Sequence, residues 1–208
     1  MVRRTKEDAQ ATRQLLLEAA QRVFAEKGVS RTSLQDIALA AGVTRGAIYW
    51  HFKNKAELFN AMMECVILPM ERAMQQIGHD ASQDPLAELE RAMLQSLHNI
   101  ATDASTRATF EIATQKVEYV EELLVVKHRH AQCQADGARE MQRSLQEAAA
   151  RRSITLAMPP SMAAQGLQAL MVGLIHSWML APEAFELVAV SRSAIRTYLV
   201  GLGLTGSM

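Results

Sequence analysis

The chain has 208 residues and a mass of 23.0 kDa, with 49% hydrophobic residues, 21% charged residues and a formal net charge of zero. This composition excludes a disordered chain, and the length can bury one large core or two smaller ones. No apolar run reaches the roughly 18 to 20 uncharged residues of a membrane-spanning helix. The charged N-terminus does not resemble a signal peptide, and Cys65 and Cys133 stand far apart. We therefore expect an intracellular protein with reduced thiols.

The zero net charge hides an asymmetry along the chain. Residues 1–60 carry ten Lys or Arg against six Asp or Glu, a net charge of +4, and the remaining residues carry −4. A basic segment on an acidic body suggests that the first part meets a polyanion. A surplus of four charges also arises on an ordinary solvated surface. The charge pattern alone therefore does not distinguish a polyanion-binding segment from such a surface.

Helical periodicity dominates the whole chain. No run alternates polar and apolar residues for long, and no hairpin turn joins two such runs. The first helix is expected over residues 7–27, where apolar residues share one face, and Gly28 is a natural C-terminal stop. The sequence therefore predicts an all-α fold.

Two short helices follow, separated by a tight turn. Thr32 or Ser33 can cap a helix over residues 34–42, and Gly42 can end it. Thr44 can cap a third helix, and a single residue separates this cap from Gly42. Two short helices joined so closely must cross at a steep angle, which is the helix-turn-helix arrangement.

The third helix is expected to have an inner and an outer side. Ile48 and Phe52 are four residues apart and should lie inward, against the first two helices. Arg45, Tyr49 and His51 remain on the outer side.

The N-terminal end of the third helix is almost bare. Gly46 and Ala47 let the backbone approach a surface closely, and the positive end of the helix dipole would point at a phosphate. These features predict a helix that reads a DNA groove. The alternative is a surface helix in an ordinary helical bundle.

At these residues the resemblance to a known family becomes specific. The stretch SLQDIALAAGVTRGAIYWHFKNKAELF is similar to the DNA-binding domain of the TetR family of bacterial repressors. The stretches VRRTKEDAQATR, QKVEY and GLIHSWMLAPEAFEL extend the similarity to the AcrR and TtgR type of multidrug-efflux repressor. The resemblance covers nearly the full chain.

The resemblance implies residue roles on double-stranded DNA. Positions that match phosphate contacts of the family are Thr32, Ser33, Thr44, Gly46, Tyr49, His51 and Lys55. Arg45 and Ala47 are best placed for base edges. Arg3, Arg4 and Lys6 either reach a minor groove or form a disordered arm. A dimer would place its two third helices in successive major grooves of a palindromic operator, about 34 to 36 Å apart.

The resemblance also implies two domains and about nine helices. A three-helix head over residues 1–54 carries the helix-turn-helix, and residues 55–208 form a larger helical domain that binds ligand and dimerises. A fourth helix over residues 55–77 should contain Pro69, whose bend either transmits the ligand state or only curves the helix. Further helices are expected over residues 85–102, 105–112, 117–151, 161–180 and 184–202.

The last two helices are candidates for the dimer interface. Small residues form a stripe on the penultimate helix, and apolar residues form a face on the last one. These residues are Gly166, Ala169, Gly173 and Ser177 on the former, and Phe185, Val188, Ile195, Leu199 and Leu202 on the latter. The resemblance implies a four-helix interface between two copies. Packing within one chain is the alternative, because a stripe shows burial but not the partner.

The larger domain offers candidates for an effector cavity. They are apolar residues (Met70, Leu89, Met93, Leu97, Phe110, Met171, Ile175 and Trp178) and possible polar contacts (Ser96, Thr114, Gln168 and His176). The chain has twelve methionines, and flexible, polarizable Met side chains adapt a cavity to ligands of different shapes. Most of these residues would be core in any helical domain. Glu111 and Glu118 could attract a cationic drug or line a solvated helix face.

Motifs of catalysis are absent from the sequence. It contains no GxSxG elbow, HExxH pair or P-loop, and His128 and His130 are two residues apart, which does not suit one metal ion. We therefore expect no enzyme, cofactor or metal. The prediction is a homodimeric repressor in the bacterial cytoplasm that controls a multidrug efflux pump operon and is released by small hydrophobic or amphipathic compounds. The alternatives are a constitutive DNA-binding regulator or activator, and a helical enzyme or carrier.

Overall fold

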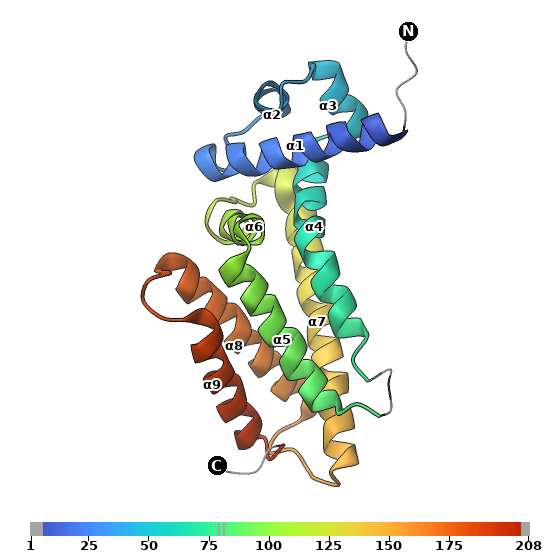
Figure 1. The fold of residues 1–208 in the computed structure, drawn as a ribbon, viewed down its shortest axis with the longest axis vertical. Coiled ribbons are helices and arrows are strands. Elements are labelled where there is room, and N and C mark those ends of the chain that lie inside the picture. Colours follow the sequence, from blue (N-terminus) through green and yellow to red (C-terminus); the bar gives the residue numbers. More distant parts are fainter. Residues whose placement is uncertain (1–5, 79, 81, 205–208) are drawn as a thin grey trace. The chain divides into compact units, whose positions relative to one another are not determined.

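The structure is a computed structural model that describes residues 6–78, 80 and 82–204. All of its elements are helices: α1 (Lys6–Lys27), α2 (Leu34–Ala40), α3 (Arg45–His51), α4 (Lys55–Gln75), α5 (Pro85–Thr102), α6 (Ala104–Gln115), η1 (Glu121–Leu123), α7 (Leu124–Arg151), α8 (Pro160–Leu180) and α9 (Leu187–Gly201) (Figure 1). No strand occurs among the described residues, and the all-α prediction is confirmed. None of the described helices is long and apolar enough to cross a membrane.

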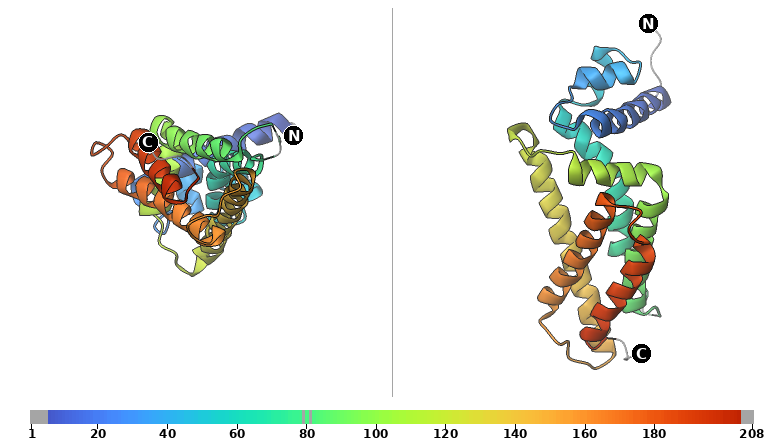
Figure 2. Two further views of the ribbon diagram at one scale, coloured as in Figure 1. Left: turned by 90° about the horizontal axis from the view of Figure 1, so that it is seen from below. Right: turned by 90° about the vertical axis from the view of Figure 1, so that its left-hand side faces the viewer.

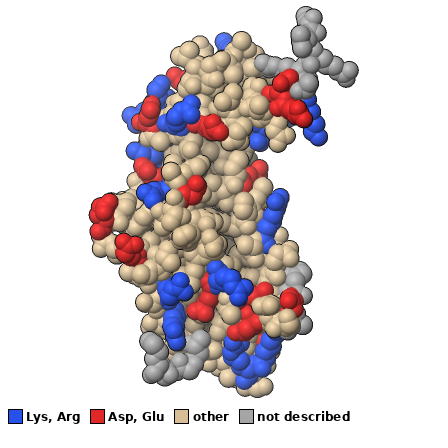
Figure 3. All heavy atoms as spheres, in the orientation of Figure 1, with Lys and Arg blue, Asp and Glu red and all other residues tan. Residues whose placement is uncertain are grey.

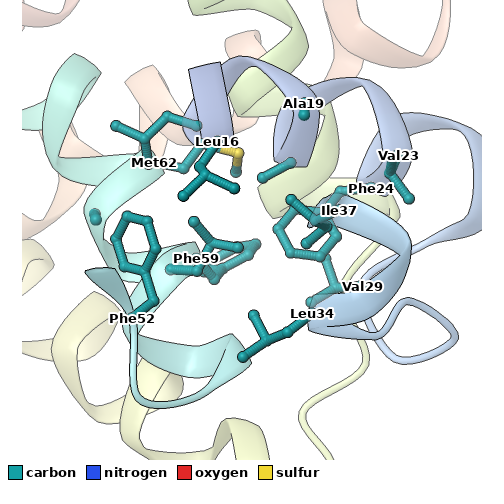
Figure 4. Close-up of a cluster of buried hydrophobic side chains, with 14 of the residues drawn as sticks. Leu16, Ala19, Val23, Phe24, Val29, Leu34, Ile37, Phe52, Phe59 and Met62 are labelled. Carbon is teal, nitrogen blue, oxygen red and sulfur yellow. The ribbon is translucent and has the colours of Figure 1, made fainter. Parts of the chain in front are cut away.

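The first of two packed units joins α1, α2, α3 and the start of α4 to residues 105–130. Side chains from these helices converge on one apolar interior, in which the rings of Phe24 and Phe59 lie 5.9 Å apart between centroids (Figure 4). Ile37 and Ile48 of the two short helices are fully buried there, and so is Ile112 of α6. Burying such a side chain contributes about 1.5 to 3 kcal/mol, so α6 is part of the core that holds the helix-turn-helix.

Two glycines end the helices where the sequence indicates. Gly28 (φ 80°) follows α1, and Gly42 (φ 66°) follows α2. Both adopt the left-handed conformation that costs a glycine little. After α2 the amide of Val43 donates to the carbonyl of Ala38 at 3.0 Å, which satisfies a carbonyl group at the helix end. The tight turn into α3 follows directly.

The second unit contains the rest of α4, α5, the larger part of α7, α8 and α9. Both α5 and α8 pack against α9, and Figure 2 shows α8 and α9 side by side. Leu97, Leu145, Leu167 and Leu199 bring one fully buried side chain from each of α5, α7, α8 and α9. These residues form an apolar interior of the second unit.

Two predicted helix starts are wrong. The helix expected from Val117 begins only at Leu124, because residues 117–120 have no regular secondary structure before the short η1 turn. The carbonyl of Lys116 accepts the amide of Val29 at 2.9 Å, which holds the start of this segment at the turn after α1. The last helix begins at Leu187, so Phe185 lies in the preceding turn.

Packing divides the chain differently from the sequence motifs. The division predicted after residue 54 separates the helix-turn-helix motif from the rest and stays a prediction. By packing, the first unit runs to Ile67 within α4, and Pro69 lies two residues beyond, inside the same helix. The α6 to α7 segment packs with the head.

Candidate nucleic-acid interface and ligand-binding region

Helix α3 is mounted on the core by one face. Thr44 caps it, and the Thr44 Oγ1 accepts the amide of Ala47 at 3.2 Å. Ile48 and the C-terminal cap Phe52 are buried, which confirms the predicted inner side. On the outer side, the guanidinium of Arg45 lies 5.6 Å from the centroid of the Tyr49 ring. The cap and the buried side chains fix the direction in which α3 presents its N-terminus.

Helix α2 is fixed by a reciprocal cap. The Ser33 Oγ accepts the amide of Asp36 at 3.2 Å, and the Asp36 carboxylate accepts the amide and hydroxyl of Ser33. The Nζ of Lys27 is 3.1 Å from the same carboxylate. The hydrogen bonds from Ser33, with those of Lys27, lower the pKa of Asp36 to about 2. The carboxylate therefore stays ionised near neutral pH.

The predicted DNA contacts fall into two groups by exposure. Ser33, Thr44, Arg45, Gly46 and Tyr49 are exposed. They share the free side of α2, the turn and α3, where a large anion has access to them.

The second group of predicted DNA contacts is turned inward. Thr32, Ala47 and Lys55 have exposed fractions of only 3%, 7% and 8%. The Thr32 hydroxyl donates to the carbonyl of Gly28 at 2.8 Å, so it belongs to the turn after α1. His51 is half-buried, and its ring meets that of Trp50 edge-on.

Lys55 in particular is held by protein groups. Its Nζ lies 2.6 Å from the Glu122 Oε1 and donates to the carbonyl of Ser30 at 3.1 Å. A cation already paired and buried in this way is poorly placed to meet a phosphate. Arg3 and Arg4 lie outside the described residues, and Lys6 is exposed at the start of α1.

Two exposed apolar residues of the helix-turn-helix were not predicted. Trp50 is 71% exposed on α3, and Leu39 is 82% exposed on α2. Helical spacing could have found Trp50, because it stands two residues from both Ile48 and Phe52 and so points away from the inner face. Large apolar side chains at a DNA-facing surface can contact thymine methyl groups.

Hydrogen bonds and an ion pair join the head to the α6 to α7 segment within the first unit. The Gln21 amide group donates to Ser105 and Thr109 of α6, and the Ser30 hydroxyl donates to the carbonyl of Glu118. The amide of Val29 donates to the carbonyl of Lys116, and Lys55 pairs with Glu122. Helix α6 is therefore bonded directly to α1 of the head.

The effector candidates of the second unit are mostly core residues. Leu89, Met93, Leu97, Met171 and Trp178 are buried, whereas Met70, Ser96 and Ile175 are half-buried and His176 is exposed. The buried amide group of Gln168 donates to the backbone carbonyl of Gln134 at 2.7 Å, so it ties α8 to α7. The Ser96 hydroxyl donates to the carbonyl of Ala92 within α5.

The other two effector candidates belong to the first unit. Phe110 is half-buried on α6, and Thr114 is exposed and donates its hydroxyl to the Phe110 carbonyl at 2.8 Å. Both residues lie on the helix that is bonded to the head.

The candidate dimer residues do not share one environment. Ala169, Gly173 and Ser177 are exposed on α8, and a Cβ on Gly173 would meet nothing within 4 Å. A Cβ on Gly166 would instead clash with the Tyr198 hydroxyl oxygen, so that glycine lets α9 approach α8 within the chain.

On α9, Ile195 and Leu199 are buried within the second unit, and Val188 is half-buried. Residues already buried in the chain add little area to an interface. The exposed large apolar side chains of α8 and α9 are Met162, Val172, Leu180 and Val190.

Among the described residues, no group of three or more His, Cys, Asp or Glu side chains could hold a metal ion. The Tyr119 hydroxyl and the His130 Nδ1 lie 3.2 Å apart. Burial raises the pKa of Tyr119 and lowers the pKa of His130, so both groups favour their neutral forms.

Comparisons with known proteins agree with this geometry. Residues 16–62 match the model of bacterial regulatory proteins of the tetR family, and residues 84–203 match the C-terminal region of MAATS-type transcriptional repressors. The HTH-type transcriptional regulator TtgR of Pseudomonas putida is 37% identical over 188 residues, which are 90% of each chain.

Two solved structures are similar over almost the same length. NalD, the secondary repressor of the MexAB-OprM multidrug efflux pump in Pseudomonas aeruginosa, is 36% identical with a TM-score of 0.85, over 95% of this chain and 98% of that one. A complex of SmeT with triclosan is 33% identical with a TM-score of 0.82, over 92% and 91%. SmeT is the repressor of the Stenotrophomonas maltophilia multidrug efflux pump SmeDEF. With a helix-turn-helix in place and such relatives along nine tenths of its length, the chain belongs to the TetR family of bacterial regulatory proteins.

Proposed function

We propose that the chain is a ligand-released repressor that binds a palindromic operator as a homodimer and controls a multidrug efflux operon. The observation that carries the proposal is the exposed outer side of α2 and α3 on a chain whose relatives, NalD and SmeT, repress multidrug efflux pumps. The family membership supports transcriptional regulation in preference to an enzyme or a carrier.

The exposed residues would make two kinds of contact with DNA, to phosphates and to base edges. Thr44 and Tyr49 offer hydroxyl groups to phosphates, whereas the Ser33 hydroxyl already donates to the Asp36 carboxylate, and the bare Gly46 lets the N-terminus of α3 come close. Arg45 is the only cation of α3 on that side, and a guanidinium can bind the O6 and N7 of guanine in a bidentate way. Arg45 would therefore read sequence, whereas the hydroxyl groups would fix the register.

The dimer would form through the exposed face of α8 and α9. Ala169, Gly173 and Ser177 leave room for a helix of the second copy, and Val190 adds an exposed apolar side chain. Such an interface would hold two heads for successive major grooves about 34 to 36 Å apart. Gly173→Arg should convert the dimer to a monomer in light scattering, whereas a variant that stays folded and dimeric would place the interface elsewhere.

An effector of hydrophobic or amphipathic character would release the repressor. Support comes from the complex of SmeT with triclosan and from the buried Met93 and Met171 of the second unit. Phe110 of α6 would link the ligand to the head, since α6 is bonded to α1 through Gln21. A hundredfold weaker operator binding corresponds to a coupling of roughly 2.7 kcal/mol, and the ligand must lose the same factor on the operator-bound form.

The DNA-binding part is tested with an operator selected from random DNA. Arg45→Ala should lower the discrimination between operator and a single-base variant by about 1 to 3 kcal/mol in fluorescence anisotropy. Arg72→Ala removes an exposed arginine of α4 in the second unit and is the matched control. Unchanged sequence preference in Arg45→Ala would remove this residue from base reading.

The effector part is tested by calorimetric titration of triclosan with and without operator. Phe110→Ala and Met171→Ala should weaken binding to the free protein, and operator should weaken it in the wild type. If triclosan and a varied panel of apolar compounds bind neither state, or bind both equally, the chain is a constitutive DNA-binding regulator. The dimer and operator results would then stand without the release mechanism.

A further inference from the structure

A groove with an arginine-rich lining runs between α5 and α9 in the second unit. Its volume is about 550 Å³, and its lining includes Arg91 and His98 of α5 and Arg192 and Arg196 of α9. Figure 3 shows Lys and Arg atoms on the face that contains α5 and α9, with Asp and Glu atoms beside them. None of the effector candidates lines this groove, so it is a separate feature of the second unit.

Helix geometry brings the polar and apolar parts of the lining together. Arg192 and Arg196 are one turn apart on α9, with Val188 one turn before them. On α5, Leu94 and His98 are likewise one turn apart. The groove therefore has an apolar part and a cationic part along the same two helices.

The positive charge of the groove is not neutralised by the protein. Three arginines line it against one carboxylate, that of Glu90, and in the described part of the chain none of the three forms an ion pair. The arginines of α7 behave differently: Arg129, Arg139, Arg143 and Arg151 each pair with a carboxylate, and so does Arg152 directly after the helix. Like charges one helical turn apart repel each other, and a bound anion would relieve that repulsion.

We propose that this groove binds an amphipathic organic anion, with a carboxylate, sulfonate or phosphate group on an apolar body. Guanidinium groups bind such oxyanions through paired, charge-assisted hydrogen bonds, and Arg192 and Arg196 present two of them on one side. The apolar body would lie on Leu94 and Val188. The volume is within the roughly 300 to 1,000 Å³ of small-molecule sites.

The groove is also distinct from the apolar hollow that Val190, Ser193 and Thr197 of α9 line with Leu170 of α8. Val190 belongs to the proposed dimer face, whereas Val188 is the one predicted interface residue that lines the groove. On a helix, Arg196 and its neighbour Thr197 point about 100° apart. A ligand could therefore occupy the groove while a second copy covers the apolar hollow.

The probe for the test is anilinonaphthalene sulfonate, a fluorescent anion with an apolar body, titrated against the DNA-free protein. Arg196→Gln should weaken its binding about tenfold, and the double variant Arg192→Gln with Arg196→Gln should weaken it further. Arg72→Gln removes the same charge from an exposed site on α4 and should change binding less than about twofold. N-phenylnaphthylamine, which lacks the sulfonate, should bind all variants equally.

Three outcomes would overturn the proposal. The double variant could bind the sulfonate probe as the wild type does, which would place the probe in another apolar site. Arg72→Gln could weaken binding as much as Arg196→Gln, which would make the effect one of overall charge. Light scattering could show that the double variant loses its dimer while its circular dichroism is unchanged, which would assign the arginines to an interface between copies. Because the titration contains no DNA and compares only arginine variants of the groove with the wild type, its failure would leave the proposed repressor function untouched.

Discussion

The two packed units differ in what burial reveals about function. In the first unit the core and the candidate interface are opposite sides of the same short helices, so exposure separates Arg45 and Tyr49 from Ile48. In the second unit the effector candidates are themselves core residues, and Leu89 or Met93 would be buried with or without a ligand site. A surface that meets DNA can be identified by exposure, whereas an interior that admits a small molecule cannot.

The largest expected effect tests the core side of the first unit. Phe59→Ala should lower the free energy of unfolding by about 3 to 5 kcal/mol, because a fully buried aromatic ring leaves a cavity. The matched control is Trp50→Ala, which removes a ring that is 71% exposed and should stay within about 0.5 kcal/mol. Urea unfolding followed by circular dichroism gives both values. Equal losses would mean that Trp50 is part of the core.

The same comparison in the second unit uses two glycines of α8. Gly166→Ala should destabilise by about 1 to 3 kcal/mol, because the new Cβ would clash with the Tyr198 hydroxyl, which donates a hydrogen bond to the carbonyl of Ala163. Gly173→Ala meets nothing within 4 Å in the chain and gains about 1 kcal/mol of helix propensity.

Protein concentration separates the two glycines further. If Gly173 lies in the dimer face, the gain from Gly173→Ala should shrink as the concentration rises through the dimer dissociation range. Thermal unfolding at several concentrations measures this change. A destabilised Gly173→Ala and a neutral Gly166→Ala would reverse the assignment of the two positions.

The sequence predicts the helix-turn-helix well because its signals are local. The caps at Ser33 and Thr44 and the glycine stops at Gly28 and Gly42 act over three or four residues, and each stands where the spacing indicates. Local signals of this kind can be read from a single chain.

The sequence is less informative where distant residues contribute. Lys55 matches a family position that contacts phosphate and stays a predicted DNA contact, but its Nζ is already paired with Glu122, 67 positions away. The segment from Val117 continues a helical pattern, yet its backbone bonds to the turn after α1. For Gly166 and Gly173 the sequence shows the same small residue, and only the position of Tyr198 distinguishes them. A helical stripe shows burial without naming the partner.

A smaller effect is expected at the ion pair that joins the head to η1. Glu122→Gln should cost about 1 kcal/mol, because the buried Nζ of Lys55 keeps the carbonyl of Ser30 but loses its carboxylate. The expected loss of stability is lower than for a fully buried ion pair, because the Glu122 side chain is 55% exposed to solvent. Glu121→Gln changes the neighbouring charge, which forms no ion pair in the described part of the chain, and serves as the control.

The consequence for coupling is measured on the same two variants. If the segment after α6 carries the ligand signal to the head, Glu122→Gln should reduce the factor by which an effector weakens operator binding, and Glu121→Gln should not. Identical coupling in both variants would show that the signal reaches α3 by another route.

The smallest expected effect is the surface ion pair between Asp84 and Arg152, which are 2.7 Å apart and join α5 to the end of α7. A double-mutant cycle of Asp84→Asn and Arg152→Gln should give a coupling of about 0.2 to 1 kcal/mol. Asparagine can still accept the amide of Leu86 as the cap of α5, so the cycle isolates the charge.

The pH dependence of this coupling has a definite sign. The hydrogen bond from Arg152 is the main cause of a pKa of Asp84 below its ordinary value of 3.8. A carboxyl group with a lowered pKa stabilises the folded chain above the ordinary value, and the stabilisation is lost as the pH falls through the lowered one. The coupling free energy should therefore vary by less than about 0.2 kcal/mol between pH 5 and 7. It should shrink when the pH falls below the ordinary pKa, and it should also fall at high salt. A coupling that instead grows on acidification would mean that Asp84 and Arg152 stabilise the chain through packing and the cap, with the charge contributing nothing.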